Sequence, residues 1–196
     1  MLGVAGACTG GEPQGSAADS APERAQAVAP APATREAYLI SSTGIGAVRL
    51  AMTLDEARRA IPSATFARTS DGDGAALVEV TLTSDTALIV FAGEDDASAP
   101  IDWTKRISMI ETFSPAFATA EGVRPGAMVR DVESVFGRTR EIVKSEIESR
   151  EYIAFENQPT YLTLRLDYTG VFQGAARATK EYQPDARILS IAVSAD

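Results

Sequence analysis

The side chains that most often carry out catalysis are scarce in this sequence. Its 196 residues include no histidine and a single cysteine, Cys8. Without histidine there is no Ser-His or Cys-His nucleophile pair, and the imidazole ligands of transition-metal sites are missing. One cysteine also cannot form a disulfide within the chain. The sequence thus indicates no cofactor, and carboxylates remain as the candidates for chemistry.

Two glutamates have a spacing that acid/base catalysis uses. Glu146 and Glu148, in the segment KSEIESREY, fall on one side of an extended chain. Two carboxylates on one face form the minimal acid/base pair of a glycoside hydrolase. A surface ladder of opposite charges, with Arg150 on the same side, accounts for the same pattern. We therefore assign no catalytic residue and keep a carboxylate-based hydrolase as an alternative.

Another group of carboxylates has the ligand chemistry of a calcium site. Glu94, Asp95, Asp96 and Asp102 lie within GEDDASAPIDW, and calcium prefers such oxygen ligands. Their spacing fits no known calcium-binding loop. The segment is predicted to be a solvated acidic loop, and no metal is expected.

Tyrosine and arginine side chains in the second half of the chain favour protein binding. Tyr161 and Arg165 fall on the polar face of a strand expected at 161–168, and Tyr152 has a similar position on the preceding strand. Both residue types combine a large contact area with a polar group, and both are enriched at protein interfaces. Tyr152, Tyr161 and Arg165 are the predicted partner-binding residues, although a solvated sheet face would give the same pattern.

The overall charge narrows the choice of partner. The formal net charge is −9, from 27 acidic and 18 basic residues. A polyanion is repelled by such a field, so no nucleic acid is expected to bind. No run approaches the roughly 18 apolar residues of a membrane span. Contact with a membrane is expected only through a lipid on Cys8.

The amino-terminal residues indicate export. Residues 1–8, MLGVAGAC, read as the end of a signal peptide, and AGAC resembles a bacterial lipobox, in which the cysteine is lipidated. Alternatively, Ala5-Gly6-Ala7 is the small-x-small site of ordinary signal peptidase, or an accidental match. Residues 9–36 are rich in Ala, Pro, Gly and Ser, which predicts a disordered tether. The expected location is the periplasmic side of a bacterial membrane, or the soluble periplasm.

Two similar segments organise the rest of the chain. GIGAVRLAMTLDEARRAIP (44–62) and AEGVRPGAMVRDVESVFG (120–137) each predict a short amphipathic helix. Thr53 and Glu56 predict a capping box for the first helix, and Gly137 a stop for the second. The second helix is predicted to bury one apolar stripe, which comprises Val129, Val132, Val135 and Phe136. Four strand-like runs follow each helix: 63–69, 75–82, 86–93 and 105–113, then 139–147, 150–157, 161–168 and 186–194.

These patterns predict an α+β fold of two tandem repeats, each a short helix packed on a roughly four-stranded antiparallel sheet. The first repeat is predicted at 37–114 and the second at 115–196. A single unit of this size buries little core, and a second copy either extends the sheet or packs beside it.

The segment VRLAMTLDEARRAIP resembles the Gly-Met-Thr helix start of the SmpA/BamE-like outer-membrane lipoproteins. The tandem layout is similar to that of the beta-lactamase inhibitory proteins, where two such units present one concave sheet. Ala51 replaces the family glycine in the first segment, and Gly126 in the second lacks the following threonine. The resemblance implies a small protein that binds other proteins of the cell envelope, and it brings no catalytic residue.

The sequence therefore predicts an exported, lipid-anchored bacterial envelope protein of non-catalytic, protein-binding type. One alternative is a hydrolase that acts on an envelope glycan through Glu146 and Glu148. The other is a structural domain with an apolar ligand cavity of about 300 Å³ or more between helix and sheet.

Overall fold

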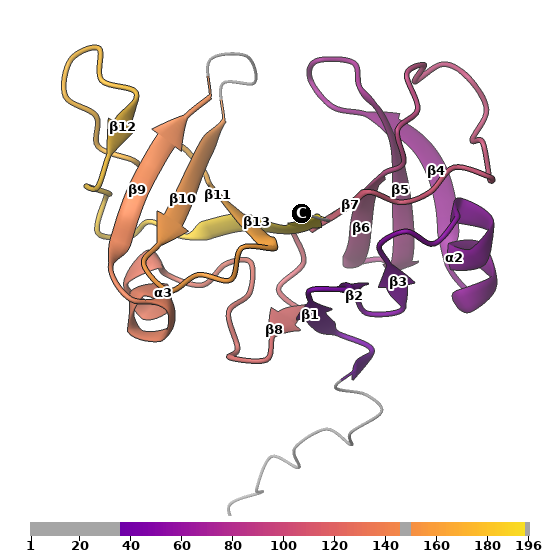
Figure 1. Cartoon of the computed structure of the whole chain (residues 1–196), viewed down its shortest axis with the longest axis horizontal. Helices are drawn as coiled ribbons and strands as arrows, with labels where there is room; N and C mark the ends of the chain where they lie inside the picture. The colour runs from indigo at the N-terminus through magenta and orange to yellow at the C-terminus, as the bar shows by residue number, and fades with distance from the viewer. Residues whose placement is uncertain (1–35, 146–149, 195–196) are drawn as a thin grey trace, which may run out of the picture.

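A computed structural model describes residues 36–145 and 150–194 of the chain (Figure 1). Cys8, the predicted signal segment at 1–8 and nearly all of the predicted tether at 9–36 lie outside these residues. Within the described ranges no helix has the length and apolar character that a membrane span requires. In chain order the elements are β1 (Leu39–Ser41), β2 (Gly44–Ile45), β3 (Val48–Arg49), α2 (Leu54–Ala60), β4 (Thr65–Ser70), β5 (Ala76–Thr83), β6 (Thr86–Phe91), β7 (Met109–Thr112), β8 (Ala118–Thr119), α3 (Val129–Phe136), β9 (Thr139–Lys144), β10 (Glu151–Phe155), β11 (Leu162–Leu166), β12 (Ala178–Thr179) and β13 (Ile188–Ser194).

The protein is mainly β, so the predicted α+β fold of two helix-and-sheet repeats is wrong. One continuous antiparallel sheet of nine strands, in the order β12-β9-β10-β11-β13-β7-β6-β5-β4, runs through both halves of the chain. Its central strand β13 pairs with β11 on one side and with β7 on the other. Two separate sheets would have left unpaired backbone groups along β7 and β13, and this pairing removes both edges.

A second, smaller sheet was not expected from the sequence. Its strands are ordered β3-β2-β1-β8, and β1 and β8 run parallel. Each of these strands has only two or three residues. Such short strands show no measurable period-2 pattern, which is why they were missed.

Figure 1 shows the nine-stranded sheet folded into two wings that meet where β13 pairs with β7, with α2 and α3 on their outer sides. Strands β5 and β6 alternate buried and half-buried side chains, as expected when one face packs on a core. We call the other face, between the wings, the open face. The core between sheet and helices includes Leu54, Ala57, Val78, Val80, Leu88 and Val90 in the first half, and Val129, Val132, Phe136, Ile153, Phe155 and Leu164 in the second.

The helix ends follow the sequence closely. The predicted capping box is confirmed: the Glu56 amide donates to Thr53 Oγ1 at 3.1 Å, and the Thr53 amide donates to Glu56 Oε2 at 2.7 Å. Gly137 ends α3 with φ of 79°. Val135, however, is 42% exposed rather than buried. At about 100° per residue it lies at the margin of the apolar stripe, roughly 100° from Phe136.

The residues just before the two helices have the same local geometry. The Ala51 amide donates to the Ile107 carbonyl at 2.8 Å, and the Gly126 amide donates to the Ile188 carbonyl at 2.7 Å. Both residues have a left-handed backbone conformation, with φ of 65° for Ala51 and 84° for Gly126. A left-handed alanine places its Cβ close to the following carbonyl, which costs roughly 1–2 kcal/mol.

We therefore expect Ala51→Gly to raise the free energy of unfolding by about 1 kcal/mol. Gly126→Ala should lower it by a similar amount, because nothing lies within 4 Å of the added Cβ and only the backbone strain remains. Urea unfolding measures both changes. Ala47→Gly, at an exposed alanine without a positive φ, is the control and should destabilise. A destabilised Ala51→Gly variant would contradict the strain at this position.

Candidate functional site

The open face of the nine-stranded sheet is the candidate site. Large apolar side chains remain accessible on it, among them Phe113, which is 44% exposed, and Val143. Two cavities described below have lining residues on this face, and no residue of α2 or α3 lines either of them. The face is therefore a surface on which another molecule can bind without unfolding the core.

A cavity of about 220 Å³, which we call the central cavity, lies between the wings. Leu77, Ile89, Met109 and Phe113 give it an apolar lining from the first wing. Polar residues of both wings complete the lining, namely Thr69, Ser70, Asp71, Glu111, Arg150 and Arg165. The cavity thus combines an apolar lining with charged groups at its border.

The two arginines at the central cavity each form an ion pair with a carboxylate of this chain. Arg150 lies 3.5 Å from Asp71, so that the second wing contacts the turn that follows β4 in the first. Arg165 lies 3.1 Å from Glu111. Each positive charge at the border therefore already has a carboxylate partner within the protein.

The Arg165–Glu111 pair belongs to a buried network at the junction of the wings. Strand register places Arg165 opposite Ser190 and Glu111 opposite Ala192. The Ser190 hydroxyl donates to the same Glu111 oxygen as Arg165, and both Glu111 and Ser190 are buried. The Arg165 guanidinium also lies 5.7 Å from the centre of the Phe113 ring. Arg165 is thus fixed by its own fold. Ser190, which is fully buried, is out of reach of any substrate.

The structure brings together two of the three predicted partner-binding residues. Tyr152 and Arg165 are direct cross-strand neighbours in the β10–β11 pair. Tyr161 lies four residues before Arg165, which is about 13 Å along a strand, and it packs partly against the core. Burial and the nearby Glu121 carboxylate raise the pKa of the Tyr161 phenol. Tyr161 therefore lies apart from the other two.

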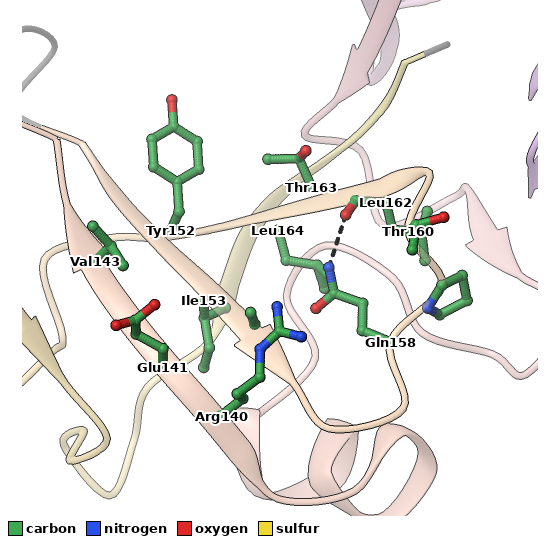
Figure 2. A pocket seen from close by; sticks show the side chains of 12 residues that line it. Arg140, Glu141, Val143, Tyr152, Ile153, Gln158, Thr160, Leu162, Thr163 and Leu164 are labelled. Atoms are coloured by element: carbon green, nitrogen blue, oxygen red, sulfur yellow. Dashed lines mark hydrogen bonds between the residues drawn. The ribbon is translucent and has the colours of Figure 1, made fainter. Parts of the chain in front are cut away.

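A larger cavity of about 340 Å³ lies over β9, β10 and β11. Figure 2 shows Arg140 and Gln158 at this cavity, with Tyr152 and Thr163 on its other side. The Gln158 side chain donates to the Leu162 carbonyl at 2.7 Å and accepts from the Phe155 amide at 3.2 Å. We call this the β9–β11 cavity.

The acidic loop of the first half contains carboxylates that are already engaged. Arg68 and the Asp102 amide both donate to Glu94. Hydrogen bonds from Ser98 lower the pKa of Asp96, and hydrogen bonds from Thr104 lower that of Asp102. Within the described residues no group of three such side chains is placed to hold a metal ion.

The other carboxylate candidates, Glu146 and Glu148, lie outside the described residues. Their distance from each other, which decides between hydrolase geometries, is thus not part of the structure. The hydrolase alternative gains no support from the described part of the open face.

Sequence reasoning missed the contribution of the first half to the open face. Leu77, Ile89 and Phe113 occupy outward positions on or next to strands that it took for the core of one repeat. The signal was present in AALVEVTL (75–82), where apolar residues occupy both faces near its start. A strand that is apolar on both faces packs against something on each side, or presents one face to a partner.

Comparisons with known proteins bear on the fold alone. No model of a known protein family matches the sequence, and no curated protein sequence matches it. The fold is similar to that in the crystal structure of the uncharacterized protein YfeY from Escherichia coli, with a TM-score of 0.51 and 15% identity. The match covers 80% of this chain and 99% of that one. It supports a shared architecture and says nothing of activity.

Proposed function

We propose that this protein is a non-catalytic, lipid-anchored protein of the bacterial envelope that binds another protein on its open face. The observation that carries the proposal is the central cavity, with Phe113 exposed at its border. Binding hot spots between proteins are aromatic or apolar side chains that fill such pockets. Phe113 supplies one anchor, and the cavity accepts another from the partner.

The size of the central cavity favours a protein partner over a small molecule. Pockets for drug-sized ligands have roughly 300–1,000 Å³, whereas this cavity has about 220 Å³. That volume suits one large side chain of a partner. The surrounding open face, with Tyr152, Val143 and Phe113, then supplies the rest of the contact area.

The charges at the cavity favour an uncharged anchor. Arg150 and Arg165 are each paired with a carboxylate of this chain. A charged partner side chain would displace one member of a pair and leave the other desolvated without a counter-charge. A large apolar or aromatic side chain leaves both pairs intact and covers Leu77, Ile89 and Met109.

Export and lipid anchoring rest on the sequence around Cys8. In this proposal the lipid holds the chain at the periplasmic side of a membrane, where the folded part binds its partner. Mass spectrometry of the mature amino-terminal peptide tests the anchor. A mature chain that begins elsewhere than at an acylated Cys8 would contradict it.

Site-specific photo-cross-linking tests the docking surface. A photoreactive phenylalanine at position 113 is expected to form an adduct with one envelope protein in irradiated cells. The same probe at Val135, an exposed apolar residue of α3 on the outer side of the sheet, is the matched control and should give none. Equal adducts at both positions, or none at 113, would argue against docking on the open face.

A further inference from the structure

The β9–β11 cavity owes its polar border to a bulge in β9. Glu141 pairs with Ala154 and Thr139 with Phe155, which leaves Arg140 as an extra residue between them. In a regular strand Arg140 and Glu141 would point to opposite faces, but both are exposed and both line the cavity. Bulges of this kind redirect a side chain, and here one brings a cation and an anion to the same cavity.

Gln158 keeps the floor of the cavity open. The β10–β11 ladder ends at the pair Ile153–Leu164. Beyond it, the side chain of Gln158 accepts from the backbone amide of Phe155 and donates to the backbone carbonyl of Leu162. In a continued ladder this amide and this carbonyl would bond to each other. Figure 2 shows the bond to Leu162 as a dashed line. The two strands are therefore held apart by a side-chain amide of fixed length.

Four polar side chains at this cavity have no hydrogen-bond partner within residues 36–145 and 150–194. They are those of Arg140, Glu141, Thr160 and Thr163, all of them exposed. Together they offer guanidinium donors, carboxylate acceptors and two hydroxyls that do both. Val143 and Ile153 add apolar surface to the lining, and Tyr152 borders the cavity with its ring directed away from Arg140 in Figure 2.

We infer that the β9–β11 cavity binds a neutral, hydroxyl-rich ligand of the sugar class. Neighbouring hydroxyls on a ring accept from Arg140 and donate to Glu141 at the same time, whereas a carboxylate has no donor for Glu141 and an alkylammonium has no acceptor for Arg140. The opposite charges of Arg140 and Glu141 cancel, so a charged ligand meets one repulsive group for each attractive one. The apolar part of the lining, with Val143 and Ile153, provides surface for the ring carbons of a sugar. The volume of about 340 Å³ lies within the range of small-ligand sites.

An NMR titration of the ¹⁵N-labelled full chain tests this site independently of the proposed protein docking. N-acetylglucosamine, glucose and galactose are the neutral probes, and inorganic phosphate and 1,4-diaminobutane are the charged ones. We expect at least one sugar to shift the amide peaks of Ala154, Thr163 and the Gln158 side chain. The titration extends to about 50 mM, above the ~1 mM dissociation constants of weak specific complexes. The affinity should change little with salt, because no net charge is neutralised.

Variants of the lining residues test whether the sugar binds in this cavity and whether the cavity is an anion site instead. Arg140→Met and Thr163→Val should each weaken sugar binding, by about tenfold for the charged donor. Lys144→Met, which removes an exposed cation of β9 that does not line the cavity, should leave it unchanged. The inference is overturned by the absence of shifts with every sugar, by shifts elsewhere in the protein, or by insensitivity to both variants. Tighter binding of phosphate than of any sugar, strengthened in Glu141→Gln, would also overturn it.

Discussion

Arg68→Met is expected to lower the free energy of unfolding by about 3–5 kcal/mol. The Arg68 guanidinium donates to both Glu94 oxygens, at 2.7 and 2.5 Å, and also to the carbonyls of Ala99 and Pro100. The side chains are only 15% and 8% exposed. Removing the cation leaves Glu94 as a buried charge without its partner, and it releases the loop that lies beside the edge strand β4. Chemical denaturation measures the loss.

Two control variants distinguish the effect of leaving Glu94 without its counter-charge from the effect of removing an arginine side chain. Arg68→Met combined with Glu94→Leu should regain much of the stability, because an apolar pair leaves no unpaired charge. Arg59→Met removes a cation that pairs with Asp55 but is 69% exposed, and it should cost at most about 1 kcal/mol. If Arg68→Met costs no more than Arg59→Met, the buried pair does not stabilise the loop.

The same pair sets a pH dependence. The hydrogen bond from Arg68 holds the pKa of Glu94 below its ordinary value of 4.5, against burial, which raises it. A carboxyl whose pKa is lower in the folded state stabilises the fold fully above the unfolded pKa, and this stabilisation is lost as the pH falls through the folded pKa. The stability gap between the wild type and Glu94→Gln should therefore be constant near neutral pH and shrink below pH 4.5. A gap that widens on acidification would contradict this sign.

What could be predicted from the sequence is local. The capping box of Thr53 and Glu56 joins residues three apart, and the buried alternation of Leu162, Leu164 and Leu166 needs only one strand. Such features follow from backbone geometry and side-chain chemistry within a few residues. They are independent of how the strands are finally ordered.

What could not be predicted depends on contacts between distant residues. The pairing of β7 with β13 joins segments about 80 residues apart and decides that the strands of both halves form one sheet. The sequence predicts a solvated acidic loop around Glu94, because nothing in the spacing of its carboxylates indicates the ion pair with Arg68 on β4. The sequence predicts Arg165 as a partner-binding residue and does not indicate its ion pair, because Glu111 belongs to the other half of the chain. A sequence contains many acidic and basic residues, so it does not show which of them form ion pairs in the fold.

The docking proposal makes the second large prediction: Phe113→Ala should weaken binding of the cross-linked partner by about 2–4 kcal/mol, or roughly 30-fold to 1,000-fold. Phe113 is 44% exposed, so its removal leaves the core intact and the unfolding transition nearly unchanged. Isothermal titration with the purified partner measures the affinity. Tyr152→Ala should have a smaller effect, because Tyr152 does not line the central cavity.

Arg165→Ala behaves differently, although Arg165 is one of the predicted partner-binding residues. Its removal leaves Glu111 buried with only the Ser190 hydroxyl, which should destabilise the fold by several kcal/mol. A loss of binding in this variant therefore reflects a disturbed junction between the wings as much as a lost contact. Arg165→Met with Glu111→Gln keeps the volume and removes both charges, so it should retain partner binding if the pair is structural. Docking through Phe113 on the open face is contradicted if Phe113→Ala binds the partner as tightly as the wild type.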